Sequence, residues 1–327
     1  MMHVPINFVI DCSDDELIGY RNIDFHNHPS LFASGNFCWC LQTYLILSKR
    51  NNVSVQCSNR LVSNAVNLVH SDQLLRLKGK PNDFIVCIRA DYPKRLWAQY
   101  HIVQNQNQIS SYTSFIPHWV QPGLIKRNPS RKEVLRVAYS GQTFNGNLAG
   151  SVEDWRKIFS PHGIEFVTLT AGSWNNLSDI DVLVALRSFD SKPHDTKPPS
   201  KLFNAWHSKI PLVAGYDSAF MQVGNPGKDY LLASTPQEVT DAVLKLKGDP
   251  DFYQTIVENG QKKASLYDEN TIAEIWEDVL VNLVLKRYYL WKKRRFFESI
   301  RFFVFLKIGI YIHQSKQLIK QLIKVKD

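Results

Sequence analysis

Short apolar runs alternate with stretches of helical spacing through the first third of the chain. The runs are rich in β-branched residues, which favours strands, and apolar residues three and four apart between them favour helices. The predicted strands of this part are residues 6–10, 53–56, 83–91 and 101–106. Helices are predicted over 36–50 and over 93–100, which begins with a proline, and the polar segment 11–31 is expected to be a loop. This order of elements indicates a parallel sheet built from βαβ units.

The alternation stops between residues 110 and 129, where three prolines and a glycine indicate a connection between domains. It resumes with predicted strands at 134–140, 164–170, 181–187, 210–215 and 229–234. The predicted helices begin at Ser151, Ser200 and Thr235 and cover 250–265 and 269–298. We therefore expect an α/β protein in which two Rossmann-like βαβ domains face each other across a cleft. The predicted division is a first domain at 1–115, a linker at 116–133, a second domain at 134–280 and a helical tail at 281–327.

Length and cysteine usage fit this organisation. The chain has 327 residues, 44% of them apolar, which is enough for two domains with their own cores. The cysteines, all in the first third, are Cys12, Cys38, Cys40, Cys57 and Cys87. An odd number without regular spacing argues against a disulfide framework, and no second Cys/His pair completes a zinc site. We expect buried thiols in a reducing cytoplasm, and the first residues lack the pattern of a signal peptide.

The positive charge of the chain is concentrated in its tail. The net charge is +9, yet residues 281–327 hold 12 Lys/Arg against 2 Asp/Glu, and the remainder is nearly balanced. Aromatic residues alternate with the basic ones, and the longest apolar run, 302–312, is too short to span a bilayer. The pattern predicts a basic amphipathic helix that lies on anionic lipid. Packing of this helix on the body of the protein is the alternative, and the balanced body argues against nucleic-acid binding.

The segment 197–220 carries the strongest candidate chemistry. Lys197 precedes two prolines and Ser200, which is predicted to be the N-cap of a helix that also brings Lys201 to its first turn. A helix N-terminus with added cations is suited to binding an anion. An ordinary helix–strand unit of an α/β domain is the alternative. Asp217 and Ser218 open a further turn after the next strand.

Further candidates follow other predicted strands. The glycine loop 141–146, with Gly141 and Asn145, is suited to close approach of a phosphate, although a tight turn alone would explain it equally well. Arg187 ends a strand and suits bidentate phosphate contact, while Asp179 and Asp181 at the start of that strand are expected to be solvated or capping groups.

Two first-domain residues are candidate general bases. Asp91 ends the strand 83–91 and faces the expected cleft, although a structural pair with Arg89 would also account for it. His28 lies in the long first loop together with His26. No third ligand accompanies these histidines, so we expect no metal, and a single histidine suits proton transfer near neutral pH. A surface or packing role is the alternative for either histidine.

Several motifs resemble those of GT-B glycosyltransferases. They are Lys197–Trp206, the strand motif Ile210-Pro211-Leu212-Val213, the linker motif Pro117–Leu124 and Val103-Gln104-Asn105. The resemblance covers residues 83 to 280. It implies an acceptor-binding first domain, a nucleotide-sugar-binding second domain and no fixed metal or other cofactor. The donor-binding residues that it implies are Gly141, Asn145, Arg187, Lys197, Ser200, Lys201, Asn204, Asp217 and Ser218. The implied catalytic candidates are His28 and Asp91.

The sequence departs from this family at one motif. Many retaining members carry two glutamates eight residues apart, where this chain has Thr196 and Asn204. Inversion with a first-domain base therefore competes with retention. The resemblance implies transfer of a sugar from a nucleotide-sugar to a lipid-linked or polysaccharide acceptor, at the inner face of the plasma membrane. A non-catalytic protein that binds a nucleotide-sugar or recruits a partner at the membrane, and a membrane-surface scaffold without a ligand, are the alternatives.

Overall fold

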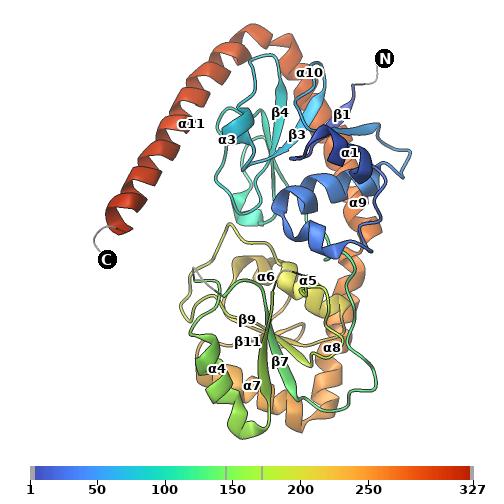
Figure 1. Cartoon of the computed structure of the whole chain (residues 1–327), viewed down its shortest axis with the longest axis vertical. Helices are drawn as coiled ribbons and strands as arrows, with labels where there is room; N and C mark the ends of the chain where they lie inside the picture. The colour runs from blue at the N-terminus through green and yellow to red at the C-terminus, as the bar shows by residue number, and fades with distance from the viewer. Residues whose placement is uncertain (1–3, 144–145, 171, 325–327) are drawn as a thin grey trace.

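The computed structural model describes residues 4–143, 146–170 and 172–324, and it shows two α/β domains stacked one above the other (Figure 1). The first domain has a six-stranded parallel sheet in the order β2-β1-β3-β4-β5-β6. Its strands are β1 (Ile6–Val9), β2 (Val55–Ser58), β3 (Val66–His70), β4 (Phe84–Ile88), β5 (Tyr100–Val103) and β6 (Thr113–Phe115). The two parallel sheets confirm the predicted fold class.

The second domain has a five-stranded parallel sheet in the order β11-β10-β9-β7-β8. Its strands are β7 (Arg136–Ser140), β8 (Glu165–Leu169), β9 (Val182–Ala185), β10 (Leu212–Ala214) and β11 (Leu231–Leu232). The central strands of both sheets are buried on both faces, which explains their nearly continuous apolar runs.

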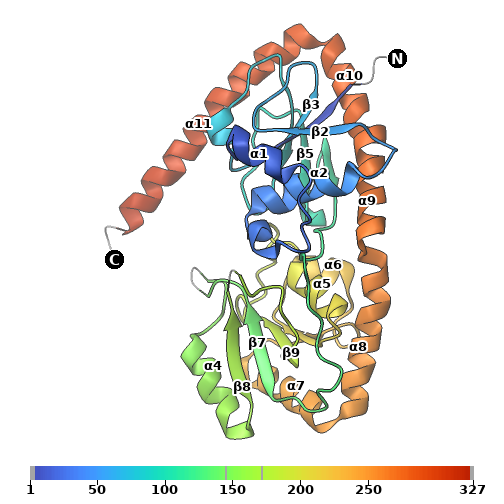
Figure 2. The same cartoon turned by 45° about the vertical axis from the view of Figure 1, so that its right-hand side comes forward.

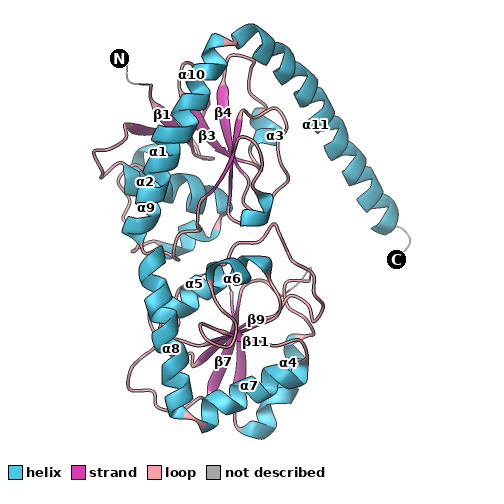
Figure 3. Cartoon of the chain, turned by 180° about the vertical axis from the view of Figure 1, so that it is seen from behind, coloured by secondary structure: helices cyan, strands magenta, loops and turns pink. Residues whose placement is uncertain are grey.

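Helices cover the sheets (Figure 3). In the first domain they are α1 (Asp14–Tyr20), α2 (Gln42–Leu47), which follows a π-helical turn η2 (Phe37–Leu41), and α3 (Leu74–Leu77). In the second domain they are α4 (Val152–Phe159), α5 (Ser200–His207), α6 (Ser218–Val223), α7 (Pro236–Gly248) and α8 (Pro250–Ala264). The C-terminal helices are α9 (Glu269–Asp278), α10 (Leu285–Lys293) and α11 (Arg295–Lys324), with a π-helical turn η6 (Val279–Val284) between the first two. The short 3₁₀ turns are η1 (Pro29–Ala33), η3 (Gln106–Gln108), η4 (Ser160–His162) and η5 (Ser265–Tyr267).

Three local predictions for the first domain are wrong. The predicted helix at 93–100 is a series of turns, because Arg95 and Trp97 are buried there and the Arg95 Nε atom donates to the Ser71 carbonyl at 2.9 Å. The predicted loop 11–31 contains α1, which begins with a capping box between Ser13 and Glu16. Strands β3 and β6 were not expected at all.

The helices α9 and α10 return from the second domain and pack on the first (Figure 2). Trp276 lies edge-to-face with Phe8 of β1, and Tyr288 and Trp291 lie against Phe84 of β4. This helical path joins the core of the first domain, so the predicted boundary at residue 280 lies inside a continuously packed segment. The tail that was expected to begin at 281 is therefore core structure as far as Trp291.

Helix α11 starts on the first domain, and its C-terminal half extends away from the body of the protein (Figures 1 and 3). Phe302 is buried in a small cluster with Trp97, and Glu298 is paired with Arg287 at 2.8 Å and with Arg301 at 2.7 Å. The first half of α11 thus packs on the body, which was the alternative to a fully lipid-facing tail. Among the described residues, no helix is both long and apolar enough to cross a membrane.

Candidate active site

A hollow of about 440 Å³ lies between the two domains. Loops that follow the carboxyl ends of strands in both sheets form it, which is where parallel α/β sheets bind ligands. Seven of the residues singled out in the sequence line this hollow: Asp91, Gly141, Arg187, Lys197, Ser200, Lys201 and Asn204. Segments more than a hundred residues apart in the chain therefore converge on one cleft.

Lys201 is the central cation of the cleft. It lies in the first turn of α5, and its Nζ atom is 5.1 Å from the centre of the Tyr139 ring. Burial and the positive charge of Arg187 lower the pKa of Lys201 to about 7. Burial removes the water that would stabilise the charge of this ammonium group. A bound anion therefore stabilises its charged form more than it would stabilise a lysine in water.

Arg187 follows β9 and is fixed from behind. Its Nε atom donates to Asp217 Oδ2 at 3.1 Å, and both side chains are largely buried. Asp217 is also the N-cap of α6, accepting a hydrogen bond from the Ala219 amide. Arg187 lines the cleft, so Asp217 positions the guanidinium rather than reaching the hollow itself. Ser218 accepts a hydrogen bond from Asn105 of the first domain at 2.8 Å and likewise lies outside the lining.

An ion pair joins the two domains across the cleft. Lys197 Nζ lies 2.6 Å from Asp91 Oδ2, and Gln104 also donates to Asp91. Ala90, directly before Asp91, has a φ of 46°, a conformation that non-glycine residues adopt rarely and at an energetic cost. The loop after β4 is thus held in a strained shape that presents the Asp91 carboxylate to the second domain.

The start of α5 and the glycine loop differ in detail from the prediction. Ser200 is the first helical residue, and the N-cap is Pro199, which has no side chain that accepts a hydrogen bond from the helix. The Gly141 amide donates to the Leu169 carbonyl at 2.9 Å, so it is not free for a phosphate. Glycine is needed there for another reason. Its φ is +139°, a backbone conformation that residues with a side chain rarely adopt.

Other predicted residues lie elsewhere. His28 precedes the turn η1 and does not line the cleft. Asn204 lines it, and its side-chain oxygen accepts a hydrogen bond from the Gln121 amide of the linker at 3.3 Å. Asn145 lies outside the described residues. Within the described part of the chain, no three His, Cys, Asp or Glu side chains converge as metal ligands.

Two histidines that were not singled out from the sequence do line the cleft. His118, in the linker, has Nδ1 2.6 Å from the Trp119 carbonyl and Nε2 3.5 Å from Cys38 Sγ, and burial lowers its pKa. His70 ends β3, and burial lowers its pKa to about 4, so its ring is neutral near pH 7. The position of His70 at the end of a strand would mark it as a cleft residue, but the sequence pattern does not predict that strand.

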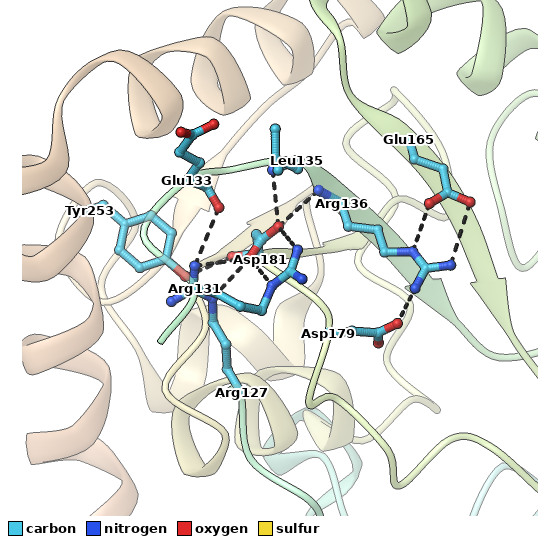
Figure 4. Close-up of polar contacts among 9 residues, drawn as sticks. All are labelled: Arg127, Arg131, Glu133, Leu135, Arg136, Glu165, Asp179, Asp181 and Tyr253. Atoms are coloured by element: carbon cyan, nitrogen blue, oxygen red, sulfur yellow. Dashed lines mark hydrogen bonds and ion pairs between the residues drawn. The ribbon is translucent and has the colours of Figure 1, made fainter. Parts of the chain in front are cut away.

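Asp181 was expected to be solvated or a capping group, and this is wrong. The carboxylate is fully buried beneath the second sheet, where it accepts hydrogen bonds from both Arg127 and Arg131 of the linker (Figure 4). The amides of Leu135 and Arg136 also donate to it. Burial alone would raise the pKa of Asp181, but the hydrogen bonds hold it below its usual value. This network anchors the linker to the second domain and lies outside the cleft.

Comparisons with known proteins follow the architecture. No protein-family model matches the chain, and no curated protein matches its sequence. Among solved structures, the chain is similar to Anabaena HepE in complex with UDP and glucose, with a TM-score of 0.56 and 13% identity over 86% of this chain and 100% of that one. TarM, with a TM-score of 0.49 and 10% identity, aligns with 74% of this chain, which covers 58% of TarM. The lipopolysaccharide outer core galactosyltransferase WaaB aligns at a TM-score of 0.41 and 12% identity, over 86% of this chain and 99% of that one.

Two parallel α/β domains with a cleft at their strand ends, together with the alignment along the full length of HepE, define the fold. The chain has the GT-B glycosyltransferase fold.

Proposed function

We propose that the protein is a glycosyltransferase that moves a sugar from a nucleotide-sugar to an acceptor bound on its first domain. The observation that carries this proposal is the cationic wall of the cleft, where Lys197, Lys201 and Arg187 lie around the start of α5. Cations at a helix N-terminus are suited to a diphosphate. The HepE structure that shares the fold holds UDP and glucose, which supports a nucleotide-sugar as the ligand.

The chemistry needs stabilisation of the departing nucleoside diphosphate. Arg187 provides fixed positive charge, and Lys201 adds a charge when a bound diphosphate raises its pKa, in a site partly screened from water where electrostatic stabilisation is largest. Lys197 is paired with Asp91 and would exchange this partner for a phosphate. We propose that this exchange frees the Asp91 carboxylate to act as general base on the acceptor hydroxyl. His28, the other candidate base, lies outside the cleft lining and is the weaker choice.

The test is a thermal-shift panel of nucleoside diphosphates and nucleotide-sugars on the wild type and on Lys201→Met. We expect at least one compound to stabilise the wild type, and the variant to bind it about 10- to 100-fold more weakly, because a hydrogen bond to a charged group contributes about 1.5–3 kcal/mol. Lys192→Met is the matched control, since Lys192 is an exposed lysine of the same domain outside the cleft. A wild type that no nucleotide stabilises refutes the proposal.

A second candidate function is non-catalytic binding of a nucleotide-sugar. The observation that favours it is Asn204, which takes the position of a glutamate in many retaining relatives and is engaged by the linker amide of Gln121. Release of nucleoside diphosphate in the presence of an acceptor extract separates the two functions. Turnover that is lost in Asp91→Asn, with nucleotide binding retained, supports the enzyme; binding without any turnover supports the alternative.

We also propose that α11 holds the protein on an anionic membrane, at the inner face of the plasma membrane, where the acceptor is a lipid-linked or polysaccharide glycan. The outer face of α11, opposite the side packed on the body, carries exposed apolar residues: Phe296, Phe297, Ile300, Phe303, Val304, Ile308 and Tyr311. Lys307 lies within this face, and Lys292, Lys293 and Arg294 lie directly before α11. Each cation near an anionic surface adds about 1 kcal/mol.

Sedimentation with vesicles tests this proposal. Truncation near residue 281 would remove Tyr288 and Trp291 from the core, so substitutions on the outer face are the sharper perturbation. We expect the triple variant Phe296→Ser, Phe297→Ser, Phe303→Ser to lose most of its binding to anionic vesicles. Ile18→Ser, which changes an exposed apolar residue of α1, should bind as the wild type does. Equal sedimentation of the triple variant and the wild type, or no preference for anionic over neutral vesicles, rules the proposal out.

A further inference from the structure

A second, smaller hollow of about 150 Å³ adjoins the cleft on the first-domain side. It shares Gly35, His70 and Tyr92 with the cleft and lies beyond the carboxyl end of β3. Its other lining residues are mostly polar, and none of them belongs to the proposed diphosphate site. The two hollows therefore form one continuous surface with a cationic end on the second domain and a polar end that includes two carboxylates on the first.

Three polar atoms at this end are buried without a hydrogen-bond partner within the described part of the chain. They are Nε2 of His70 and both side-chain atoms of Gln73, the amide nitrogen Nε2 and the oxygen Oε1. His70 is 3% exposed and Gln73 is 5% exposed. Unpaired buried polar groups of this kind destabilise a fold, and a ligand that forms hydrogen bonds with them would offset that loss.

The space next to His70 depends on Gly35. A Cβ atom at this position would lie 2.9 Å from His70 Nε2, which is closer than a methyl group tolerates. The Gly35 backbone has no positive φ, so the reason for glycine here is space and not conformation. Tyr92 stands at the rim edge-to-face with His70, with ring centres 5.2 Å apart, and provides an apolar wall.

The three unpartnered atoms match the chemistry of hydroxyl groups. The Gln73 amide nitrogen donates, its oxygen accepts, and a neutral imidazole nitrogen takes either role, while a hydroxyl both donates and accepts. An anion is disfavoured, because Asp11 and Asp72 also line this hollow. A cation would leave the Gln73 amide nitrogen without an acceptor. The combination of polar atoms with a tyrosine wall fits a neutral polyol.

We propose that the hollow formed by Gly35, His70, Gln73 and Tyr92 is a subsite for the hydroxyl groups of a neutral sugar. The role of this sugar as the acceptor rests on the proposed glycosyl transfer, whereas the subsite itself does not. Gln73 and His70 then orient the sugar by hydrogen bonds at the first-domain end of the cleft. The transferred group arrives from the cationic end.

Saturation-transfer NMR with free glucose, galactose and N-acetylglucosamine as probes tests the subsite directly. We expect the wild type to give signals with at least one of these sugars, and Gln73→Leu to weaken that binding by about tenfold, since it removes a donor and an acceptor at nearly constant volume. Gln108→Leu is the matched control, because Gln108 also has an unpartnered buried oxygen but lines neither hollow. Gly35→Ala is a second variant, which fills the space beside His70 and should also remove the signals.

The outcomes separate this subsite from the proposed function. Sugar signals that are equal in the wild type, Gln73→Leu and Gly35→Ala overturn the subsite, and so does a wild type that gives no signal with any probe. If Gln73→Leu does not fold, Gly35→Ala decides alone. Nucleotide stabilisation that persists while sugar binding proves independent of Gln73 refutes the subsite and leaves the proposed function. Sugar binding that depends on Gln73 in a protein that binds no nucleotide keeps the subsite and refutes the function.

Discussion

Because Lys201 is buried, we predict that the protein takes up a proton when it binds the nucleotide-sugar donor. Burial and the neighbouring Arg187 lower the pKa of Lys201 from its ordinary value of 10.5 to about 7. A diphosphate bound beside it brings negative charge that favours the ammonium form and raises this pKa again. Because the unliganded lysine is largely neutral above pH 7, the ligand must then bind together with a proton.

The size of the effect follows from the lowered pKa. Near pH 8 most unliganded molecules carry a neutral Lys201, so binding takes up most of one proton, and near pH 6 it takes up little. Affinity should be nearly constant below pH 7. It should fall as the pH rises above 7, by up to about tenfold per pH unit, which is about 1.4 kcal/mol.

Calorimetric titration with UDP-glucose measures this uptake. The diphosphate of a nucleotide-sugar does not titrate in this range, so heats in two buffers of different ionisation enthalpy report protons bound by the protein. Lys201→Met should abolish the uptake at the higher pH, whereas the exposed Lys192→Met should retain it. Binding of UDP-glucose with no proton uptake near pH 8, or the same uptake in Lys201→Met, would refute the reasoning.

Two predictions concern the stability of the fold. Asp181→Asn should lower the free energy of unfolding by about 3–5 kcal/mol, because it removes the buried negative charge that pairs with the partly buried Arg127 and Arg131. Asp179→Asn, at a more exposed position, should lower the free energy of unfolding by less than about 1 kcal/mol. Equal losses for the two variants in urea unfolding would contradict this prediction. Gly309→Ala should destabilise by about 1–3 kcal/mol, since its Cβ atom would lie 2.7 Å from the Trp97 ring. Gly248→Ala is the control, because no atom lies within 4 Å of its Cβ position, and it should leave the melting temperature unchanged or raise it. An equal loss of stability in both glycine variants would argue against the contact between Gly309 and Trp97.

The predicted strands are those with continuous apolar runs, which indicate burial on both faces of the sheet. DFIVCIRAD and DVLVALR contain β4 and β9, because a fully buried parallel strand needs little else. Strand β3 escaped prediction because Asn67 interrupts its apolar run. In the fold, Asn67 is buried and hydrogen-bonded to Asn7 and to the Val62 backbone, so the polar residue belongs to the sheet. Such long-range partners are not visible in local periodicity.

Candidate site residues were predictable where they follow recognisable strands. Arg187 and Asp91 end predicted strands, and Lys201 follows a loop that resembles the donor site of GT-B proteins, so the sequence alone predicts that all three line the cleft. His118 lies within the linker motif Pro117–Leu124, but nothing in that motif marks the histidine as a cleft residue, and nothing near Gln73 in sequence distinguishes it from a surface residue. Their positions depend on how the two domains meet and on the strand that was missed.

Helix α11 shows why the tail was only half predicted. Its apolar residues are spread around the helix, so periodicity could not say which stripe faces the protein. In the structure, Glu298 of α11 is paired with Arg287 of α10. Phe302 lies on the same side of α11 as Glu298, so this stripe faces Trp97 of the first domain. The membrane hypothesis therefore rests on the opposite stripe, which Phe296 and its exposed neighbours form. An apolar stripe that remains exposed after the helix has buried its other side needs a partner, and the surrounding lysines and arginines favour an anionic one.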